Sequence, residues 1–194
     1  MRSERAWQRV RESVRRFITQ RLKLKVKQQK SAVARPEEGK FLGFSFTRKR
    51  EPKRRIAPKA MARCKERVRE LTRRTRGVSL EEMGADLSAY LRGGRGYFGF
   101  CQTPWVRVHL DWWIRRRLRS VVWKQWKRFG RRAQELPKRG VSRAWAVRTA
   151  RSGLGPGRLS HDPTLCPALP HVFFDALGLP RVAAGSYRLA VISP

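Results

Sequence analysis

Acidic side chains are scarce in this chain. Its 194 residues include 14 Asp and Glu against 47 Lys and Arg, which gives a formal net charge of +33. Repulsion at this charge density opposes folding unless a polyanion neutralises it. Nucleic acid is the first partner to expect, and an anionic membrane surface is the alternative. The sequence has no apolar run of membrane-spanning length, signal-peptide core or lipidation motif, so we predict nucleic acid and no membrane.

Cysteine and histidine are also few, and they are far apart in the sequence. An odd number of scattered cysteines does not indicate a disulfide framework. The histidines do not combine with the cysteines into the spacings of zinc sites. We therefore expect a cytoplasmic protein in a reducing compartment, with no metal and no cofactor. The residues concerned are Cys64, Cys101, Cys166, His109, His161 and His171.

Aspartate is the rarest of the charged residues, and this limits the chemistry that the chain can do. Only Asp86, Asp111, Asp162 and Asp175 occur, and no two of them are adjacent. None belongs to the Tyr-x-Asp-Asp arrangement that holds two metal ions for nucleotidyl transfer. A glycine-rich phosphate loop followed by Lys and Ser or Thr is absent too. We predict no catalytic residues and no enzyme activity for this chain on its own.

The first 47 residues predict a helix followed by two strands. Apolar residues at helical spacing from position 6 to position 22 predict an amphipathic helix, with Ser3 as its cap. Apolar and lysine residues then alternate over 22–27, which predicts a strand. A polar turn at 35–39 precedes a second predicted strand at 41–46. Such a pattern is typical of the closing part of an α+β domain.

The rest of the sequence predicts helices. A basic linker at 48–57 precedes a helix from Pro58 that we expect Gly77 to end. Ser79 and Glu82 form a capping box for the next helix, which is expected to stop before residues 93–94. A long helix follows over about 104–128, and shorter helical segments are expected at 142–151, 163–167 and 171–177. The predicted fold class is therefore α+β, predominantly α-helical.

The predicted long helix has two different faces. One is apolar and is expected to form the core: Val106, Leu110, Trp113, Ile114, Leu118 and Val121. The opposite face interleaves tryptophans with arginines: Trp112, Trp123 and Trp126 with Arg115, Arg116 and Arg119. Packing against another element explains the tryptophans, and an RNA surface of stacking rings and cations is the alternative. For the arginines we favour RNA contact. Arg117 and Lys124 project toward the core side, so either they extend to water or the helix is bent there.

Several stretches resemble group II intron reverse transcriptases. Residues 23–26 with 30–31, followed by 41–44, are similar to the last two conserved blocks of the polymerase, although Lys27 stands where that family usually has asparagine. Residues 56–59 and the arginine-rich helix after them resemble the thumb. In the family, the catalytic Tyr-Ala-Asp-Asp motif stands just upstream of the position that Met1 matches. The resemblance therefore implies a truncated chain without the polymerase active site.

The later stretches resemble the maturase part of the same family. Residues 90–98 are similar to the maturase-specific signature, with Gly94 in place of the expected tryptophan. Residues 113–127 resemble the bacterial class C members most specifically. Three short stretches, at 158–160, 168–170 and 174–179, resemble the C-terminal segment of these proteins. The likeness covers about residues 1–180.

The resemblance implies a division of the chain into five segments. They are residues 1–47 as the remnant of a reverse-transcriptase palm, 48–57 as a basic linker, 58–130 as thumb and maturase-specific domain, 131–180 as the maturase C-terminal segment, and 181–194 as a tail. The implied architecture is a short N-terminal helix and a two-stranded remnant, followed by a helical thumb and maturase bundle.

The resemblance also implies a function: binding of structured group II intron RNA in its splicing-active shape, with the RNA itself doing the chemistry. Three alternatives stay open. The chain is the C-terminal half of a split RNA-directed DNA polymerase completed by its N-terminal half, a non-functional relic of a mobile element, or a general RNA chaperone. The expected RNA-binding residues are Lys23, Lys25, Lys30, Arg54, Arg55, Lys59, Arg73, Arg74, Arg92, Arg95, Arg115, Arg116, Arg119, Trp123, Lys124, Trp126 and Lys127.

Overall fold

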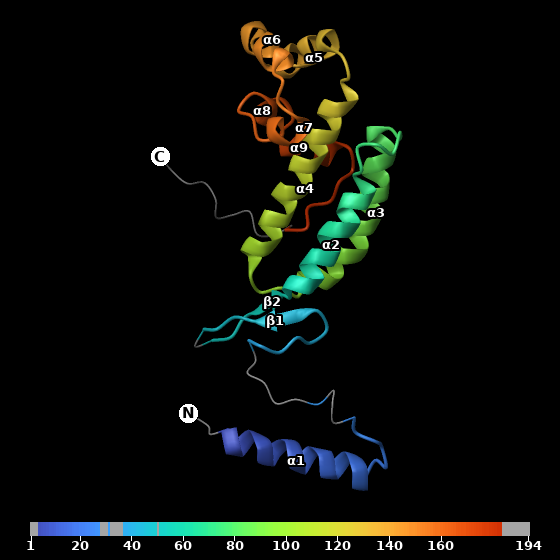
Figure 1. Cartoon of the computed structure of the whole chain (residues 1–194), viewed down its shortest axis with the longest axis vertical. Coiled ribbons are helices and arrows are strands. Elements are labelled where there is room, and N and C mark those ends of the chain that lie inside the picture. The colour runs from blue at the N-terminus through green and yellow to red at the C-terminus, as the bar shows by residue number, and fades with distance from the viewer. Residues whose placement is uncertain (1–3, 28–30, 32–36, 50, 184–194) are drawn as a thin grey trace.

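A computed structural model describes residues 4–27, 31, 37–49 and 51–183. Within these residues the chain is mostly helical and has one two-stranded antiparallel sheet, which confirms the predicted class. Figure 1 shows helix α1 (Glu4–Gln20) at one end of the molecule, a small hairpin above it, and the remaining helices beyond the hairpin. Only this last part has a continuous core.

The predicted amphipathic helix at the N-terminus is present as α1. Its apolar stripe faces outward: Val10, Val14 and Phe17 are 54%, 52% and 57% exposed. A helix whose apolar face stays open contributes little to stability, because helices in proteins are stabilised mainly by packing that face. Helix α1 is therefore positioned by chain connectivity more than by the core.

Only one of the two strands lies where the sequence predicts it: β1 (Phe44–Phe46) falls within the predicted strand at 41–46. Residues 22–27 form no strand, and Leu22 and Leu24 are more than half exposed. A lone strand has no ladder of hydrogen bonds, and the described chain offers this segment no partner. Instead β1 pairs with β2 (Arg54–Ile56), with Phe44 opposite Ile56. The second strand thus lies in the stretch predicted as a basic linker. Its two arginines are exposed and Ile56 is its only buried residue, so its sequence does not show the alternating pattern of a strand.

Three long helices form the main bundle. They are α2 (Pro58–Leu71), α3 (Leu80–Gly99) and α4 (Pro104–Gln125). Helix α2 ends at Leu71, before the predicted stop at Gly77, which has a positive φ of 75° in the turn that follows. The N–H of Glu82 donates to Ser79 Oγ at 3.0 Å, as expected of a helix cap. Helix α3 continues through Gly93 and Gly94, where the sequence predicts an end, because its buried side chains continue to Phe98.

The apolar face of α4 is the centre of the core, as predicted. Leu110, Ile114 and Leu118 are at most 1% exposed. They pack with buried residues of α2 and α3, among them Val68 and Leu87. A fully buried leucine or isoleucine contributes about 1.5–3 kcal/mol, so this stripe is a major source of the stability of the bundle.

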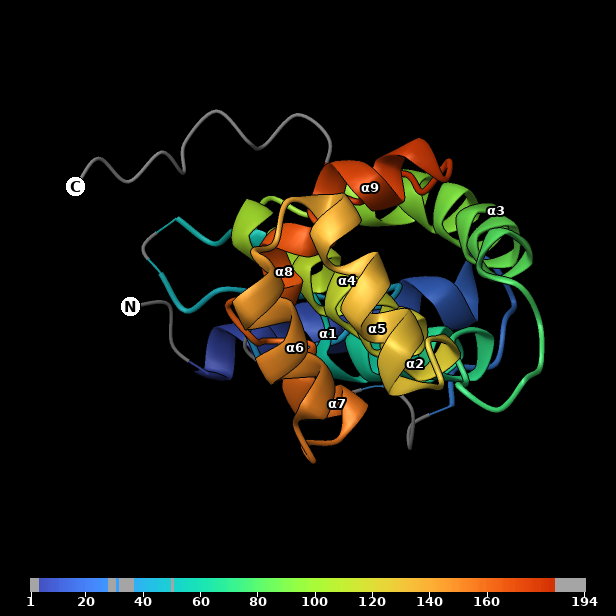
Figure 2. The ribbon, with the colours of Figure 1, turned by 90° about the horizontal axis from the view of Figure 1, so that it is seen from above.

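Short helices cover the other side of α4. Figure 1 places α7 to α9 along one side of α4 with α2 and α3 along the other, and Figure 2, seen from above, shows α8 and α3 on opposite sides of α4. Helices α6 and α9 and the turn at α8 were predicted, whereas α5 was not. The elements are α5 (Phe129–Glu135), the 3-10 helix η2 (Pro137–Arg139), α6 (Arg143–Arg151), α7 (Pro156–Leu159), α8 (Leu165–Ala168) and α9 (His171–Ala176).

A buried ionic network joins α4 to the segment after α9. Asp111 is fully buried and accepts hydrogen bonds from the N–H groups of Val182 and Ala183 at 3.0 and 2.9 Å. Arg115, only 1% exposed, donates to Asp111 at 3.2 Å and to Asp175 at 2.6 Å. Arg181 donates to the second oxygen of the Asp175 carboxylate at 2.8 Å. These charges are paired and hydrogen-bonded, which is the condition under which buried charge is tolerated.

We predict that replacing Arg115 by alanine will lower the free energy of unfolding by about 3–5 kcal/mol, because Asp111 would stay buried without its cation. Chemical denaturation followed by circular dichroism measures the loss. The neighbouring Arg116 is half-exposed and serves as the matched control, for which Arg116→Ala should change stability by about 0.5 kcal/mol or less. Equal losses in the two variants would contradict the role assigned to Arg115.

Candidate nucleic-acid interface

Most of the predicted RNA-binding residues lie on the surface. Arg116 is half-exposed, and Lys30 lies outside the described residues. The exposed ones come from the segment after α1, from β2 and from all three long helices and the turns between them. They are Lys23, Lys25, Arg54, Arg55, Lys59, Arg73, Arg74, Arg92, Arg95, Lys124 and Lys127.

The predicted aromatic and cationic face of α4 needs a correction, because most of it is buried. Arg115, Arg119, Trp123 and Trp126 are 1%, 7%, 1% and 5% exposed. A side chain that is covered on all sides cannot stack on a base or reach a phosphate without unfolding its surroundings. Of the three tryptophans assigned to this face, Trp112 alone is open to solvent, at 48%.

Each buried member of that face has a structural partner. Arg119 donates to the carbonyls of Leu169 at 3.0 Å and Ser160 at 3.4 Å, and so ties the turns before α8 and α9 to α4. The guanidinium groups of α5 and η2 cover the two tryptophans: Arg132 lies 4.6 Å from the ring centre of Trp123 and Arg139 lies 4.9 Å from that of Trp126. Cation–π contacts of this kind stabilise packed rings. The packing interpretation of these two tryptophans is therefore the one that the structure supports.

The maturase-like signature stretch is divided between core and surface. Leu91 and Phe98 are buried, while Arg92 and Arg95 on the same helix are exposed. A Cβ built on Gly94 would lie 3.2 Å from the ring of Phe98. A larger residue at this position, such as the tryptophan that the resemblance leads one to expect, requires Phe98 to move.

A cluster of cations occupies the end of the bundle where α2 turns into α3. Arg117 reaches from α4 to this turn and donates to Thr72 Oγ1 at 2.9 Å. Burial lowers the pKa of Arg117, and the charges of Arg69 and Arg74 lower it further. Like charges held together in this way favour a bound polyanion. One of the two alternatives predicted for Arg117 is that it extends from the core side to water. Its guanidinium group lies instead at the turn after α2, with its central carbon 5.6 Å from the ring centre of Trp113.

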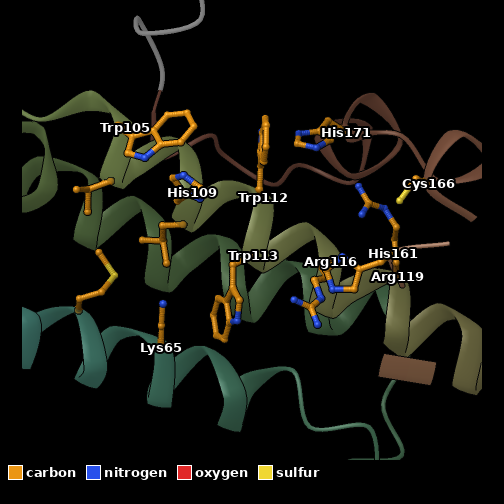
Figure 3. A pocket seen from close by; sticks show the side chains of 13 residues that line it. Lys65, Trp105, His109, Trp112, Trp113, Arg116, Arg119, His161, Cys166 and His171 are labelled. Atoms are coloured by element: carbon orange, nitrogen blue, oxygen red, sulfur yellow. The ribbon is translucent and has the colours of Figure 1, made fainter. Parts of the chain in front are cut away.

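A groove of about 700 Å³ runs along the open side of α4. Figure 3 shows Trp105, His109 and Trp112 following one another along α4, with Lys65 reaching in from α2 and His171 facing them from α9. The volume lies in the range of small-molecule sites. The described residues that line the groove are Met61, Lys65, Trp105, Val106, His109, Leu110, Trp112, Trp113, Arg116, Arg119, His161, Cys166 and His171.

Exposed aromatic rings dominate one wall of this groove. Trp105 is 62% exposed and packs edge-on against His109, with 4.0 Å between ring centres. His109 lies 6.0 Å from Trp112 on its other side. Positions 105, 109 and 112 share one helical face, since residues three and four apart are neighbours on a helix. That spacing is visible in the sequence, whereas the openness of this face is not, because it depends on which segments pack against α4.

The groove is basic, and the pKa values of His161 and His171 in it are lowered. Burial lowers the pKa of His161, and the neighbouring Arg116 and Arg119 lower it further. Burial also lowers the pKa of His171, with contributions from Arg115, Arg119 and Arg181, against which Asp175 acts in the opposite direction. The described lining residues include no carboxylate. The groove is thus suited to an anion beside a flat ring.

Metal clusters and membrane-spanning helices are two further features that concern the part of the chain that the structure describes. No group of three or more His, Cys, Asp or Glu side chains gathers there as a metal-binding cluster. None of the helices described is long and apolar enough to cross a membrane.

We predict that His171 makes the fold sensitive to mild acid. Its pKa lies below the ordinary 6.5, so the unfolded chain binds more protons than the folded one as the pH falls past that value. Stability is therefore complete above the ordinary pKa and decreases below it. In His171→Gln the Tm should fall less than in the unchanged protein between about pH 7.5 and about pH 5.5. Identical Tm losses in both proteins would refute the assignment.

The comparison with protein families identifies the helical bundle. Residues 61–140 match the model of the group II intron maturase-specific domain. This range begins in α2, contains α3, α4 and α5, and ends just after η2. No curated protein matches the chain. The matched range includes the basic end of the bundle and the α2 and α4 walls of the groove, and this part of the chain is therefore similar to the group II intron maturase-specific domain.

Proposed function

We propose that this chain binds the folded RNA of a group II intron and holds it in its splicing-active shape, while the RNA does the chemistry. The observation that carries the proposal is the coincidence of the maturase-specific domain at 61–140 with an open basic surface. The net charge of +33 and the exposed arginines of the bundle support the same partner. Folded RNA is recognised through its shape, its phosphates and its 2′-hydroxyls, which suits a broad cationic surface.

The aspartates support a binding role over a polymerase role. Asp111 and Asp175 belong to the buried network with Arg115. Asp86 pairs with Arg76 at 2.7 Å, and Asp162 accepts the N–H of Thr164 at 2.8 Å. All four thus make contacts within the fold, and Asp111 and Asp175 share the guanidinium group of Arg115. Nucleotidyl transfer uses carboxylates that share metal ions, so we assign no polymerase chemistry to this chain alone.

One observation favours a second function, that of the C-terminal half of a split reverse transcriptase. The apolar stripe of α1 is open, and Phe41 and Leu42 beside the hairpin are 72% and 74% exposed. Open apolar surface of this kind commonly marks an interaction site. The test is primer extension with a template, magnesium and a separately made fingers and palm. Extension by the mixture would support the split enzyme, and its absence would contradict that function.

We propose the segment boundaries and the likeness to class C members as finer points of the same assignment. The matched range begins three residues after Pro58 and extends past position 130, to the turn after η2. The matched range supports a maturase domain that includes all of α5. A domain boundary at residue 130 would instead fall inside that helix.

We predict that intron RNA binding weakens steeply with salt, because binding releases counterions from phosphates. Changing Arg73 and Arg74 to alanine should lower the affinity and reduce the slope of log K against log salt by about 2. Lys138→Ala is the matched control, because Glu135 lies 3.4 Å from this lysine and already offsets its charge. Filter binding over about 50–200 mM salt measures both quantities.

An unrelated structured RNA of equal length completes the design. Stronger binding to the intron at matched salt is the expected result for a maturase. Equal affinity for both RNAs would indicate a general chaperone and contradict the proposal. A salt slope that is unchanged in the double variant would exclude Arg73 and Arg74 as phosphate contacts.

A further inference from the structure

The groove beside α4 combines features that the role of an RNA-shape reader does not require. A surface that reads shape and phosphate needs cations, and these lie at the turn after α2 and along α3. The groove instead offers open aromatic rings. Trp105 and Trp112 are 62% and 48% exposed, whereas Trp123 and Trp126 on the same helix are covered. Exposed indoles cost solvation free energy in the free protein and are a sign of a binding surface.

The geometry of the rings suits a flat ligand. Trp105 and His109 meet edge to face, with an interplanar angle of 87°, and His109 and Trp112 are tilted by 57°. The rings therefore do not stack face to face with one another. A nucleobase stacks on an aromatic face of this kind, whatever its sequence, because every base has a π-face.

The cations of the groove are placed for a phosphate. Arg116 and Lys65 line it from α4 and α2, and no carboxylate is among its described lining residues. In Figure 3 Arg116 and His161 lie beyond Trp112, at the end of the groove away from Trp105. A base beside Trp112 would thus have its backbone within reach of a guanidinium group.

The ligand has to be unpaired. In a duplex, neighbouring bases cover the faces of each base, and A-form RNA exposes only the edges in its grooves. A cavity of about 700 Å³ has room for a base with its ribose and phosphate and not for a helix. Bulges, loops and strand ends of a folded RNA supply such splayed bases.

We propose that this groove captures one unpaired nucleotide of the bound RNA, with the base stacked on Trp112 and its phosphate held by Arg116, while Trp105 and Lys65 line the other end of the groove. The inference rests on the proposed RNA-binding function and specifies which part of the RNA this site takes. His161 and His171 come from beyond residue 140, so the site is completed by the segment that the buried network with Arg115 holds in place.

The test compares a short single-stranded RNA with the same strand in a blunt duplex. Trp105→Ala with Trp112→Ala removes the rings, and because both side chains are exposed the fold should persist, which thermal melting followed by circular dichroism checks. The single strand should bind at least about ten-fold more weakly to the double variant, and the duplex within about two-fold. Trp145→Ala is the matched control, since Trp145 is 55% exposed on α6 and does not line the groove. It should change neither affinity.

One further RNA and one free nucleotide identify what the groove holds. A single strand with one abasic position at its centre should bind more weakly to the unchanged protein, and the double variant should not discriminate it from the intact strand. Adenosine monophosphate as a competitor separates a free nucleotide from one within a strand. If it displaces the strand at concentrations comparable to the strand itself, the groove is a nucleotide pocket and the inference is overturned.

The remaining outcomes keep the two proposals apart. Equal losses for single strand and duplex in the double variant, or no loss for either, would overturn the groove inference and leave intron binding untouched. Ring-dependent binding of the single strand without any preference for the intron would uphold the groove and contradict the maturase function. No measurable binding of the unchanged protein to any of these RNAs would overturn both.

Discussion

The buried contact among Asp111, Arg115 and Asp175 determines how the two halves of the helical bundle fit together. Removing three charges from water is unfavourable, and the interior offsets it only when each charge has partners. Asp111 has a cation and two backbone N–H groups, and Asp175 lies between two guanidinium groups. Burial by itself would raise the pKa of Asp175, but the hydrogen bonds from Arg181 and Arg115 outweigh it and hold that pKa below its ordinary value. The carboxylate of Asp175 is thus charged at neutral pH. Helix α9 and residues 182–183 cannot shift along α4 without breaking the contacts to Arg115 and Asp111.

That constraint has a consequence for the surface. The groove is formed by α2 and α4 on one side and by His161, Cys166 and His171 on the other. The second set is positioned by the turns and helices that Arg119 and the network attach to α4. The family match ends at residue 140, so the maturase-specific domain supplies two walls of the groove and the following segment supplies the third. Arginines that look like RNA contacts in the sequence instead hold the segment that completes the groove.

The fold also divides the cations by function. With 47 Lys and Arg, any helix face contains several, and charge alone cannot distinguish a phosphate contact from an internal partner. Arg115 and Arg119 are internal because carbonyl and carboxylate oxygens of distant segments meet them there. Arg73 and Arg74 are external because they lie in a turn, where the chain leaves the core. The cluster at Arg117 lies between these cases, partly buried but still surrounded by like charge.

The sequence by itself determined the helical class, the apolar face of α4, the cap at Ser79 and the expectation of a polyanionic partner, because helical periodicity, capping and net charge are local or additive properties. It placed one strand wrongly at 22–27, since a strand exists only where a partner strand lies beside it. The strand that pairs with β1 proved to be β2. It could not tell Trp112 from Trp123, which lie on the same predicted face. Only the tertiary structure decided that Arg132 covers Trp123 while Trp112 faces an open groove, because burial depends on which distant segments pack against a helix.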